Sequence, residues 1–285
     1  MRDLNFSIKK LCDRNRDGSF STQSNRRQQL NQISNELRDL GFKDVKSTEN
    51  LKPKHVWRLV EKWQRENLST GSIKNRMSNL RWVAEKIGNT SLVAKDNKHY
   101  GIADRQYSTN ENKSLEFTPE KLNKIEDAHV RASAVLQREF GLRREEAMKI
   151  IPAKADHGDT LHLQSSWCKG GRERDIPIAT ESQREALDQA KALAGTGSLI
   201  PANSSYAQQM RIFQNQMRGA GLGQTHGARH AYAQRRYQEL VGRRCPAAGG
   251  TNPKSRKEEI REKRLIISRE LGHERESITT TYLGR

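Results

Sequence analysis

The sequence predicts a mostly helical protein with one small β-sheet, organised as two domains. Apolar residues recur at helical spacing through most of the chain, which is the pattern of amphipathic helices. The spacing changes to strict alternation only over residues 160–164 and 174–178. A polar stretch without helical period separates two such parts, and 285 residues are enough for two domains that each bury a core.

The first predicted domain, residues 1–112, is a small helical bundle. Its helices are predicted over residues 21–40, 53–63 and 73–87. Gly41 and Gly88 follow the first and third helices where C-cap glycines belong, and Pro53 opens the second. The apolar stripes include three tryptophans, which we expect in the core rather than stacked on bases: Trp57, Trp63 and Trp82.

A linker is predicted between the two domains. Residues from about 89 to 115 are polar and show no helical period. Thr118, Pro119 and Glu120 then provide an N-cap, a proline at the first helical position and an acid in the first turn. We therefore expect a domain boundary near residue 112 and a second domain over residues 113–285.

The second domain is predicted to be helical around a β-hairpin. Helices are expected over residues 118–140, 143–151, 181–193, 206–218, 226–240 and 258–271. The alternating segments 160–164 and 174–178 form the hairpin, with Lys169 at its turn. Residues 241–257, rich in glycine, proline and positive charge, are predicted as a flexible basic loop. Such a loop either contacts DNA or is a surface loop that only connects two helices.

The charge of the chain favours a polyanionic partner. Lys and Arg number 52 against 34 Asp and Glu, which gives a formal charge of +18 and a pI near 10.0. Basic residues exceed acidic ones both before and after residue 110, so both domains could contact phosphates. A merely soluble basic protein would also carry exposed charges, and only their sum favours nucleic acid.

Several functional classes are not indicated. No run approaches the roughly 20 apolar residues of a membrane span, and the N-terminus lacks the apolar region of a signal peptide, so we expect a cytoplasmic protein. Cys12, Cys168 and Cys245 are odd in number and far apart, which predicts reduced thiols rather than disulfides or a metal site. No glycine-rich ATP-binding loop is present, and neither a cofactor nor a metal is expected.

Four short fragments in the second half carry candidate chemistry. They are Gly141-Leu142-Arg143 with Glu146, Lys169-Gly170-Gly171 before Arg174, His226-Gly227-Ala228-Arg229-His230, and Leu271-Gly272-His273 followed nine residues later by Tyr282. Each fragment alone is weak evidence. Their candidate catalytic residues form a set suited to phosphoryl transfer on DNA: Arg143, Arg229, Lys169, His226, His273 and Tyr282.

In this order and spacing the fragments resemble the motifs of the tyrosine recombinase, or phage-type integrase, family. The resemblance covers essentially the full length of the chain. It implies a helical (SAM-like) core-binding domain followed by a catalytic domain. It further implies a site-specific recombinase of a mobile element that acts on double-stranded DNA as a homo-tetramer on two sites. Accessory DNA-bending proteins are further candidate partners.

The resemblance also assigns roles to single residues. Tyr282 would attack the scissile phosphate and form a 3′-phosphotyrosyl link. Arg143 and Arg229 would stabilise the charge that develops on the phosphate oxygens. Lys169 would protonate the leaving 5′-oxygen, although Arg172 or Arg174 could compete for that role.

The remaining motif residues would support these groups. His226 and His273 would handle protons or hold phosphate oxygens. Glu146 would orient Arg143 from one helical turn away, and His230 is expected to pack within its helix behind the site. Two other readings stay open: a type IB topoisomerase with the same chemistry, and an inactive integrase-derived DNA-binding protein.

Overall fold

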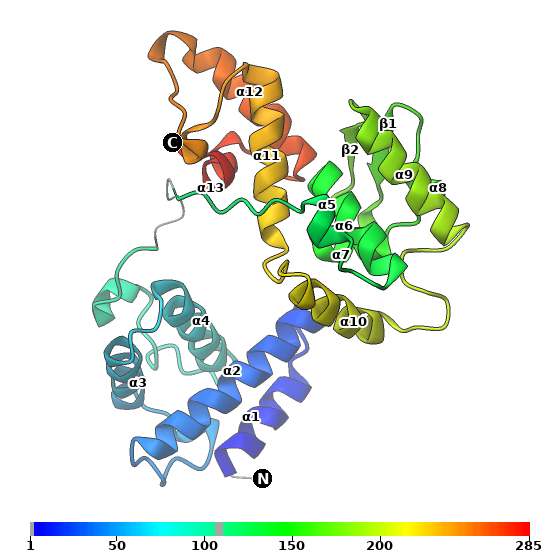
Figure 1. Cartoon of the computed structure of the whole chain (residues 1–285). Helices are drawn as coiled ribbons and strands as arrows, with labels where there is room; N and C mark the ends of the chain where they lie inside the picture. Colours follow the sequence, from blue (N-terminus) through cyan, green and yellow to red (C-terminus); the bar gives the residue numbers. More distant parts are fainter. Residues whose placement is uncertain (1–2, 106–110) are drawn as a thin grey trace. The chain divides into compact units, whose positions relative to one another are not determined.

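The computed structural model describes residues 3–105 and 111–285, which fall into two compact units, Met1–Gln106 and Tyr107–Arg285 (Figure 1). Both units are mostly helical, and the sheet of the described chain has two antiparallel strands. The predicted fold class is confirmed. Residues 106–110 of the predicted linker lie outside the described residues, and no described helix is long and apolar enough to cross a membrane.

The first unit is a helical bundle. Its helices are α1 (Asp3–Arg14), α2 (Phe20–Asp39), α3 (Pro53–Arg65) and α4 (Thr70–Lys86), with the 3-10 turns η1 (Thr48–Asn50) and η2 (Asn97–Tyr100). Helices α2, α3 and α4 lie where the sequence predicts them. Helix α1 is not predicted from the sequence, because its buried stripe consists of only Leu4, Ile8 and Cys12. Part of the predicted linker packs into this unit, since Leu92 and Tyr100 are buried in its core.

Two of the three tryptophans are core residues, as predicted. The indole N–H of Trp63 donates to the carboxylate of Glu36 at 2.7 Å, and Arg76 pairs with the same carboxylate at 2.9 Å, so α2, α3 and α4 share one buried polar contact. Trp82 is buried as well. The prediction was wrong for Trp57, which is 38% exposed. It lies at the edge of the α3 stripe, about 100° around the helix from Val56.

The second unit contains the hairpin and the remaining helices. These are α5 (Pro119–Leu122), α6 (Ala128–Phe140), α7 (Arg144–Lys149), α8 (Pro152–Ala155), β1 (Thr160–Leu163), β2 (Arg174–Pro177), α9 (Glu181–Ala194), α10 (Tyr206–Gly219), α11 (His226–Val241), α12 (Lys257–Glu270) and α13 (Thr280–Leu283). Thr160 pairs with Pro177 and Leu163 with Arg174, which confirms the hairpin. The strands are joined through two 3-10 turns, η3 (Ser165–Trp167) and η4 (Lys169–Gly171).

Two predicted elements of this unit need correction. The single helix expected over residues 118–140 is divided into α5 and α6, because Asp127 caps a new helix by accepting the backbone N–H of Val130 at 2.9 Å. The segment 241–257 is not a free excursion. Cys245 and Ala247 are buried in the main core, and the 3-10 turn η5 (Pro246–Ala248) packs against α13.

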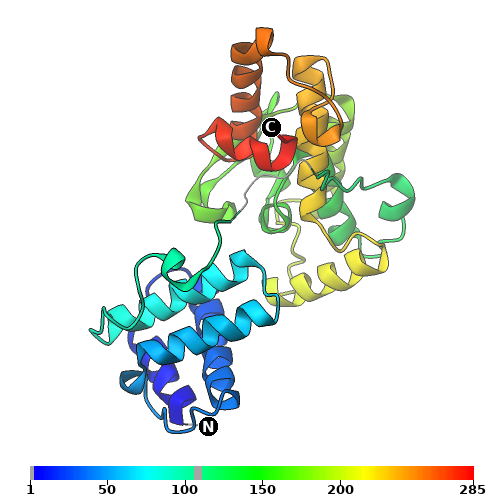
Figure 2. The ribbon, with the colours of Figure 1, turned by 90° about the vertical axis from the view of Figure 1, so that its left-hand side faces the viewer.

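Helix α11 forms the centre of the second unit. It packs against α6, α12 and α13 (Figure 1 and Figure 2). Every residue from Gly227 to Ala233 is buried, so the first two turns of α11 lie inside the protein although they carry an arginine and a histidine. A buried charge of this kind is stable only when polar groups surround it. The buried arginine and histidine at the start of α11 therefore require polar partners around them.

Candidate active site

Arg229 on α11 is the centre of a polar cluster that joins three of the four sequence motifs. Its side chain is fully buried. Nε donates to the Tyr282 hydroxyl at 3.3 Å, Nη1 donates to the Gly141 carbonyl at 2.6 Å, and Nη2 donates to the Leu271 carbonyl. Burial lowers the pKa of Arg229 to about 10, so the guanidinium stays charged at neutral pH. One side chain thus holds the tyrosine, the first arginine motif and the last histidine motif together.

The Gly141 carbonyl reaches Arg229 because of the backbone conformation at the end of α6. Gly141 is the C-cap of α6 and has a φ of +61°, in the left-handed region that favours glycine. A Cβ at this position would lie 2.5 Å from Cδ1 of Tyr232 on α11. The glycine of this motif is therefore required both by the turn and by the close approach of α11.

Arg143 follows that turn and begins α7. Its Nη1 donates to Oε1 of Glu146 at 2.7 Å, and its backbone N–H donates to Oε2 at 2.8 Å, which closes a capping box at the start of the helix. Its Nη2 lies 3.4 Å from the Leu271 carbonyl. The guanidinium groups of Arg143 and Arg229 therefore point to the same carbonyl oxygen. Glu146 thus contacts Arg143 through both of its carboxylate oxygens.

Glu146 has a second arginine partner that the sequence analysis did not assign to it. Arg174, at the start of β2, donates Nη2 to Oε2 at 2.8 Å and Nη1 to Oε1 at 3.2 Å. Burial alone raises the pKa of Glu146, but the hydrogen bond and charge of Arg174 and the charges of Arg143 and Arg229 outweigh it and lower the pKa to about 2. Glu146 is thus a buried carboxylate between arginines.

Tyr282 lies on the four-residue helix α13 and is 5% exposed. Three histidine rings surround it. The ring centres of His230, His226 and His273 lie 4.8, 5.9 and 6.3 Å from the centre of the tyrosine ring. The structure therefore brings the tyrosine together with both candidate histidines of the sequence analysis and with His230.

The environment keeps these histidines neutral. Desolvation and the nearby charges of His226, Lys113 and Arg229 lower the pKa of His230 to about 4. Desolvation and the charges of four arginines, Arg229 and Arg143 foremost, lower the pKa of His273 to about 4. Desolvation and the charges of Arg229 and Arg143 lower the pKa of His226 as well. A neutral imidazole can accept a proton or a hydrogen bond at one ring nitrogen and donate a hydrogen bond from the other.

Lys169 is the motif residue that lies apart from this cluster. It is exposed on η4, in the connection between β1 and β2, and its ammonium group forms no hydrogen bond or ion pair within the described chain. The two competing arginines differ. Arg172 is exposed, and its positive charge contributes to the lowered pKa of His273. Arg174 is instead buried and pairs with Glu146.

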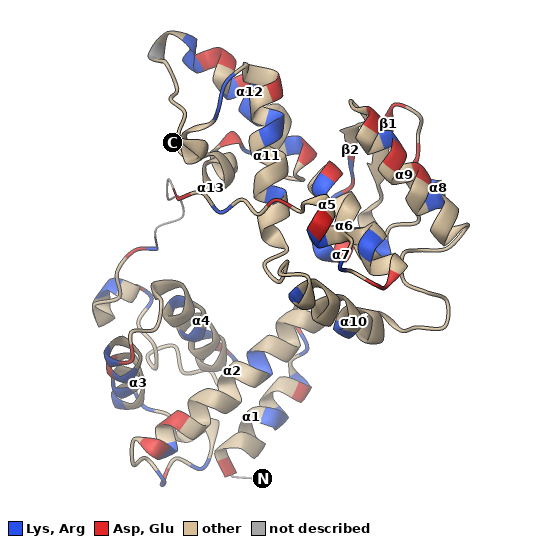
Figure 3. Ribbon diagram, viewed as in Figure 1, with Lys and Arg blue, Asp and Glu red and all other residues tan. Residues whose placement is uncertain are grey.

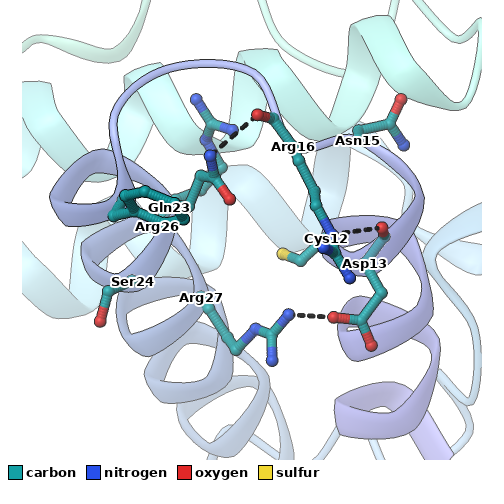
Figure 4. A pocket seen from close by; sticks show the side chains of 9 residues that line it. Cys12, Asp13, Asn15, Arg16, Gln23, Ser24, Arg26 and Arg27 are labelled. Atoms are coloured by element: carbon teal, nitrogen blue, oxygen red, sulfur yellow. Dashed lines mark hydrogen bonds and ion pairs between the residues drawn. The ribbon is translucent and has the colours of Figure 1, made fainter.

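A pocket in the first unit has a different character. It encloses about 680 Å³ between α1 and α2 and is lined by Cys12, Asp13 and Arg16, together with Arg26 and Arg27 (Figure 4). Arg27 pairs with Asp13, and Arg26 pairs with Asp17 at 3.4 Å. These carboxylates neutralise Arg26 and Arg27, whereas the Arg16 guanidinium donates, among the residues that the structure describes, only to the Asp13 backbone carbonyl at 3.3 Å.

The described residues contain no group of three or more His, Cys, Asp and Glu side chains placed to hold a metal ion. Cys12, Cys168 and Cys245 are buried free thiols. The chemical resources of the cluster are therefore two arginines aimed at one point, a tyrosine hydroxyl and neutral histidines. This set can stabilise an anion and supply a nucleophile.

Comparison with known proteins identifies the family. The family description for the N-terminal part of phage integrases matches residues 1–93, and the integrase description matches residues 106–235. Comparison with curated proteins gives no match.

Solved recombinase structures share the fold. The Tn1549 transposon integrase in complex with circular intermediate DNA has a TM-score of 0.56 at 15% identity, over 99% of this chain and 95% of that one. A lambda integrase dimer bound to a COC′ core site has a TM-score of 0.53 at 18% identity, over 82% and 88%. The XerH recombinase bound to a palindromic difH substrate also has a TM-score of 0.53 at 18% identity, over 90% and 83%. The chain belongs to the phage-type integrase family of tyrosine recombinases.

Proposed function

We propose that the protein is a site-specific recombinase that cleaves and rejoins DNA through Tyr282, in the integration or excision of a mobile element. The observation that carries this proposal is the buried hydrogen bond between Nε of Arg229 and the Tyr282 hydroxyl, with Arg143 aimed at the same region. A tail tyrosine without chemistry would have no reason to lie among two arginines and three histidines.

The reaction is an exchange of one phosphodiester for another. The Tyr282 oxygen forms a bond to the scissile phosphorus while the bond to the 5′-oxygen breaks, giving a 3′-phosphotyrosyl link and a 5′-hydroxyl. The phenol loses a proton and the leaving oxygen gains one. Because the covalent link conserves the bond energy, rejoining requires no high-energy cofactor.

Arg143 and Arg229 would stabilise the transition state. Negative charge grows on the non-bridging phosphate oxygens, and planar guanidinium groups can meet it with paired hydrogen bonds. Both groups donate to the Leu271 carbonyl in the structure. We propose that a phosphate oxygen takes over part of these bonds when DNA binds.

The proton transfers are assigned to three side chains. His226 and His273 are neutral and lie beside the Tyr282 ring, so either can help remove the phenol proton. Lys169 is proposed to protonate the 5′-oxygen. Its exposed place on the connection between the two strands leaves it free to reach bound DNA. His230 and Glu146 are proposed as supports of Tyr282 and Arg143.

The proposed substrate is double-stranded DNA. Lys and Arg are distributed over both units, which supports DNA contact by a helical core-binding domain over residues 1–112 and by a catalytic domain over residues 113–285 (Figure 3). Related structures include a lambda integrase tetramer bound to a Holliday junction. We propose the same homo-tetrameric assembly on two sites here, with accessory DNA-bending proteins as further candidate partners. We also propose a cytoplasmic location, where the three thiols stay reduced.

The test is a covalent-trapping experiment. A nicked suicide duplex, made from the end sequences of the element that carries the gene, is incubated with wild type, Tyr282→Phe and Tyr206→Phe. Tyr206 lies on α10, where its ring contacts Lys149 of α7 rather than Tyr282 or Arg229. We expect a denaturant-stable adduct with wild type and Tyr206→Phe, and none with Tyr282→Phe.

The other outcomes separate the alternatives. Tight DNA binding without any adduct would favour an integrase-derived binding protein. An adduct together with relaxation of supercoiled DNA, but without strand exchange between two sites, would favour topoisomerase chemistry.

A further inference from the structure

Arg174 is a buried arginine that the proposed mechanism does not use. Its side chain is 6% exposed, and all three of its nitrogen atoms have partners. Nη1 and Nη2 bind the two oxygens of Glu146, and Nε donates to the Glu270 carbonyl at 2.8 Å. Nη1 also lies 3.5 Å from Sγ of Cys168. The guanidinium is therefore fully engaged inside the protein.

The Glu146 carboxylate is shared between Arg174 and Arg143. Oε1 accepts from Nη1 of both arginines, and Oε2 accepts from Nη2 of Arg174 and the backbone N–H of Arg143. A two-pronged arginine contact fixes the plane of a carboxylate. Because Arg174 fixes that plane, it also determines where the Arg143 guanidinium lies.

On its other side Arg174 supports the turn that carries His273. Its Nε binds the Glu270 carbonyl, and Gly272 has a φ of +69°. A Cβ at Gly272 would lie 3.1 Å from Nη1 of Arg174, so the backbone of this turn packs directly against the guanidinium. The Leu271 carbonyl within this turn receives the bonds from Arg143 and Arg229. One side chain thus joins β2, α7 and the turn after α12.

We propose that Arg174 is a positioning residue of the recombinase. Through Glu146 and the Glu270 carbonyl it holds Arg143 and the His273 turn in the arrangement that meets the scissile phosphate, before DNA binds. This inference rests on the function proposed above. It removes Arg174 from the candidates for the proton donor, because its nitrogens are occupied and guanidinium groups do not readily release a proton.

The test distinguishes positioning from proton donation. Single-turnover cleavage is measured on a normal suicide duplex and on one whose scissile phosphate has a bridging 5′-sulfur, since a thiolate leaves without being protonated. Lys169→Ala should be slow on the oxygen substrate and recover on the sulfur substrate. Arg174→Lys should be slower by about 10²-fold on both, because a shift of about 1 Å at a catalytic group has that effect. Its DNA affinity should stay within threefold of wild type.

Two further variants make the result specific. Arg184→Lys is the matched control, since Arg184 forms a similar two-pronged contact with Asp156, at 2.8 and 3.2 Å, away from the cluster, and should cleave at the wild-type rate. Glu146→Gln combined with Arg174→Lys should be no slower than the slower single variant, because residues that act through one another are not additive. If Arg174→Lys does not fold, Arg174→Gln keeps an N–H donor and is measured in the same way.

Three results would overturn the proposal. Recovery of Arg174→Lys on the sulfur substrate would make Arg174 a proton donor, and a wild-type rate on both substrates would remove any role. Full additivity with Glu146→Gln would show that Arg174 does not act through Glu146. A wild-type protein that forms no adduct on either substrate would instead refute the proposed function, and this inference with it.

Discussion

At the residue scale, the cluster depends on satisfying a buried positive charge. Taking an arginine out of water costs several kcal/mol unless hydrogen-bond partners surround it. Arg229 obtains the Tyr282 hydroxyl and two carbonyls, and its charge is further compensated by Glu146 nearby. The hydrogen bonds that stabilise the buried charge of Arg229 also place the guanidinium beside Tyr282.

Arg229→Lys should therefore lose both activity and stability. A lysine ammonium cannot reach three acceptors in a plane, and each buried carbonyl left without a partner costs about 1–3 kcal/mol. We expect adduct formation to fall by about 10²–10³-fold and the urea midpoint to decrease. Arg235→Lys, on the same helix but 38% exposed, is the control and should change neither. An unchanged cleavage rate in Arg229→Lys would contradict the role of the guanidinium.

The pH dependence of stability follows from His230. Its pKa is about 4 in the folded protein against about 6.5 in an unfolded chain. Between these values the unfolded chain binds a proton that the folded one does not, so the free energy of unfolding falls as the pH decreases from 6.5 to 4. His230→Asn should reduce this slope by up to about 1.4 kcal/mol per pH unit. His273 has the same direction of shift, so part of the slope should persist in urea titrations.

At the scale of elements, two helix ends offer a matched comparison. Gly141 ends α6 and Gly242 ends α11, both with positive φ. Either change to alanine costs about 1–2 kcal/mol for the backbone alone. Only at Gly141 would the new Cβ meet a neighbour, at 2.5 Å from Tyr232, while nothing lies within 4 Å at Gly242. Gly141→Ala should thus be less stable than Gly242→Ala by about 1–3 kcal/mol in denaturant unfolding. Equal losses would mean that α11 moves aside freely.

Helix α13, which carries Tyr282, depends on tertiary contacts, because four residues cannot form a stable helix alone. Arg264 on α12 supplies them. Its Nε donates to Oγ1 of Thr279 at 3.1 Å, its Nη2 donates to the Gly284 carbonyl, and it pairs with Glu276 at 3.1 Å. These contacts hold the chain on both sides of Tyr282.

Arg264→Met should loosen that segment and leave the rest of the unit folded. We expect cleavage to slow by at least about tenfold, DNA affinity to stay near wild type, and trypsin to cut after Arg275 more readily. Arg261→Met, on the same helix but exposed and paired only with Glu258, should behave as wild type. Equal protection of the C-terminal segment in both variants would contradict the contribution of Arg264.

At the scale of the whole molecule, the charge of +18 governs the interaction with DNA. If six to ten phosphates are neutralised, affinity should fall by about 10³–10⁵-fold between 50 and 200 mM salt, with a linear relation between log affinity and log salt. Tyr282→Phe should give the same slope, since it removes no charge. A salt-independent affinity would argue against binding through phosphates.

The sequence by itself determined the fold class, most helices, the hairpin and the family, because helical and strand periods and motif spacing are local properties of the chain. It also named the residues that meet around Arg229. Tertiary structure alone decided how they are held. Arg174 binds Glu146 and the Glu270 carbonyl across 28 and 96 positions, and no periodic pattern records such a contact. The packing of residues 241–257 under α13 was likewise hidden, because its buried Cys245 and Ala247 lie in an otherwise polar segment.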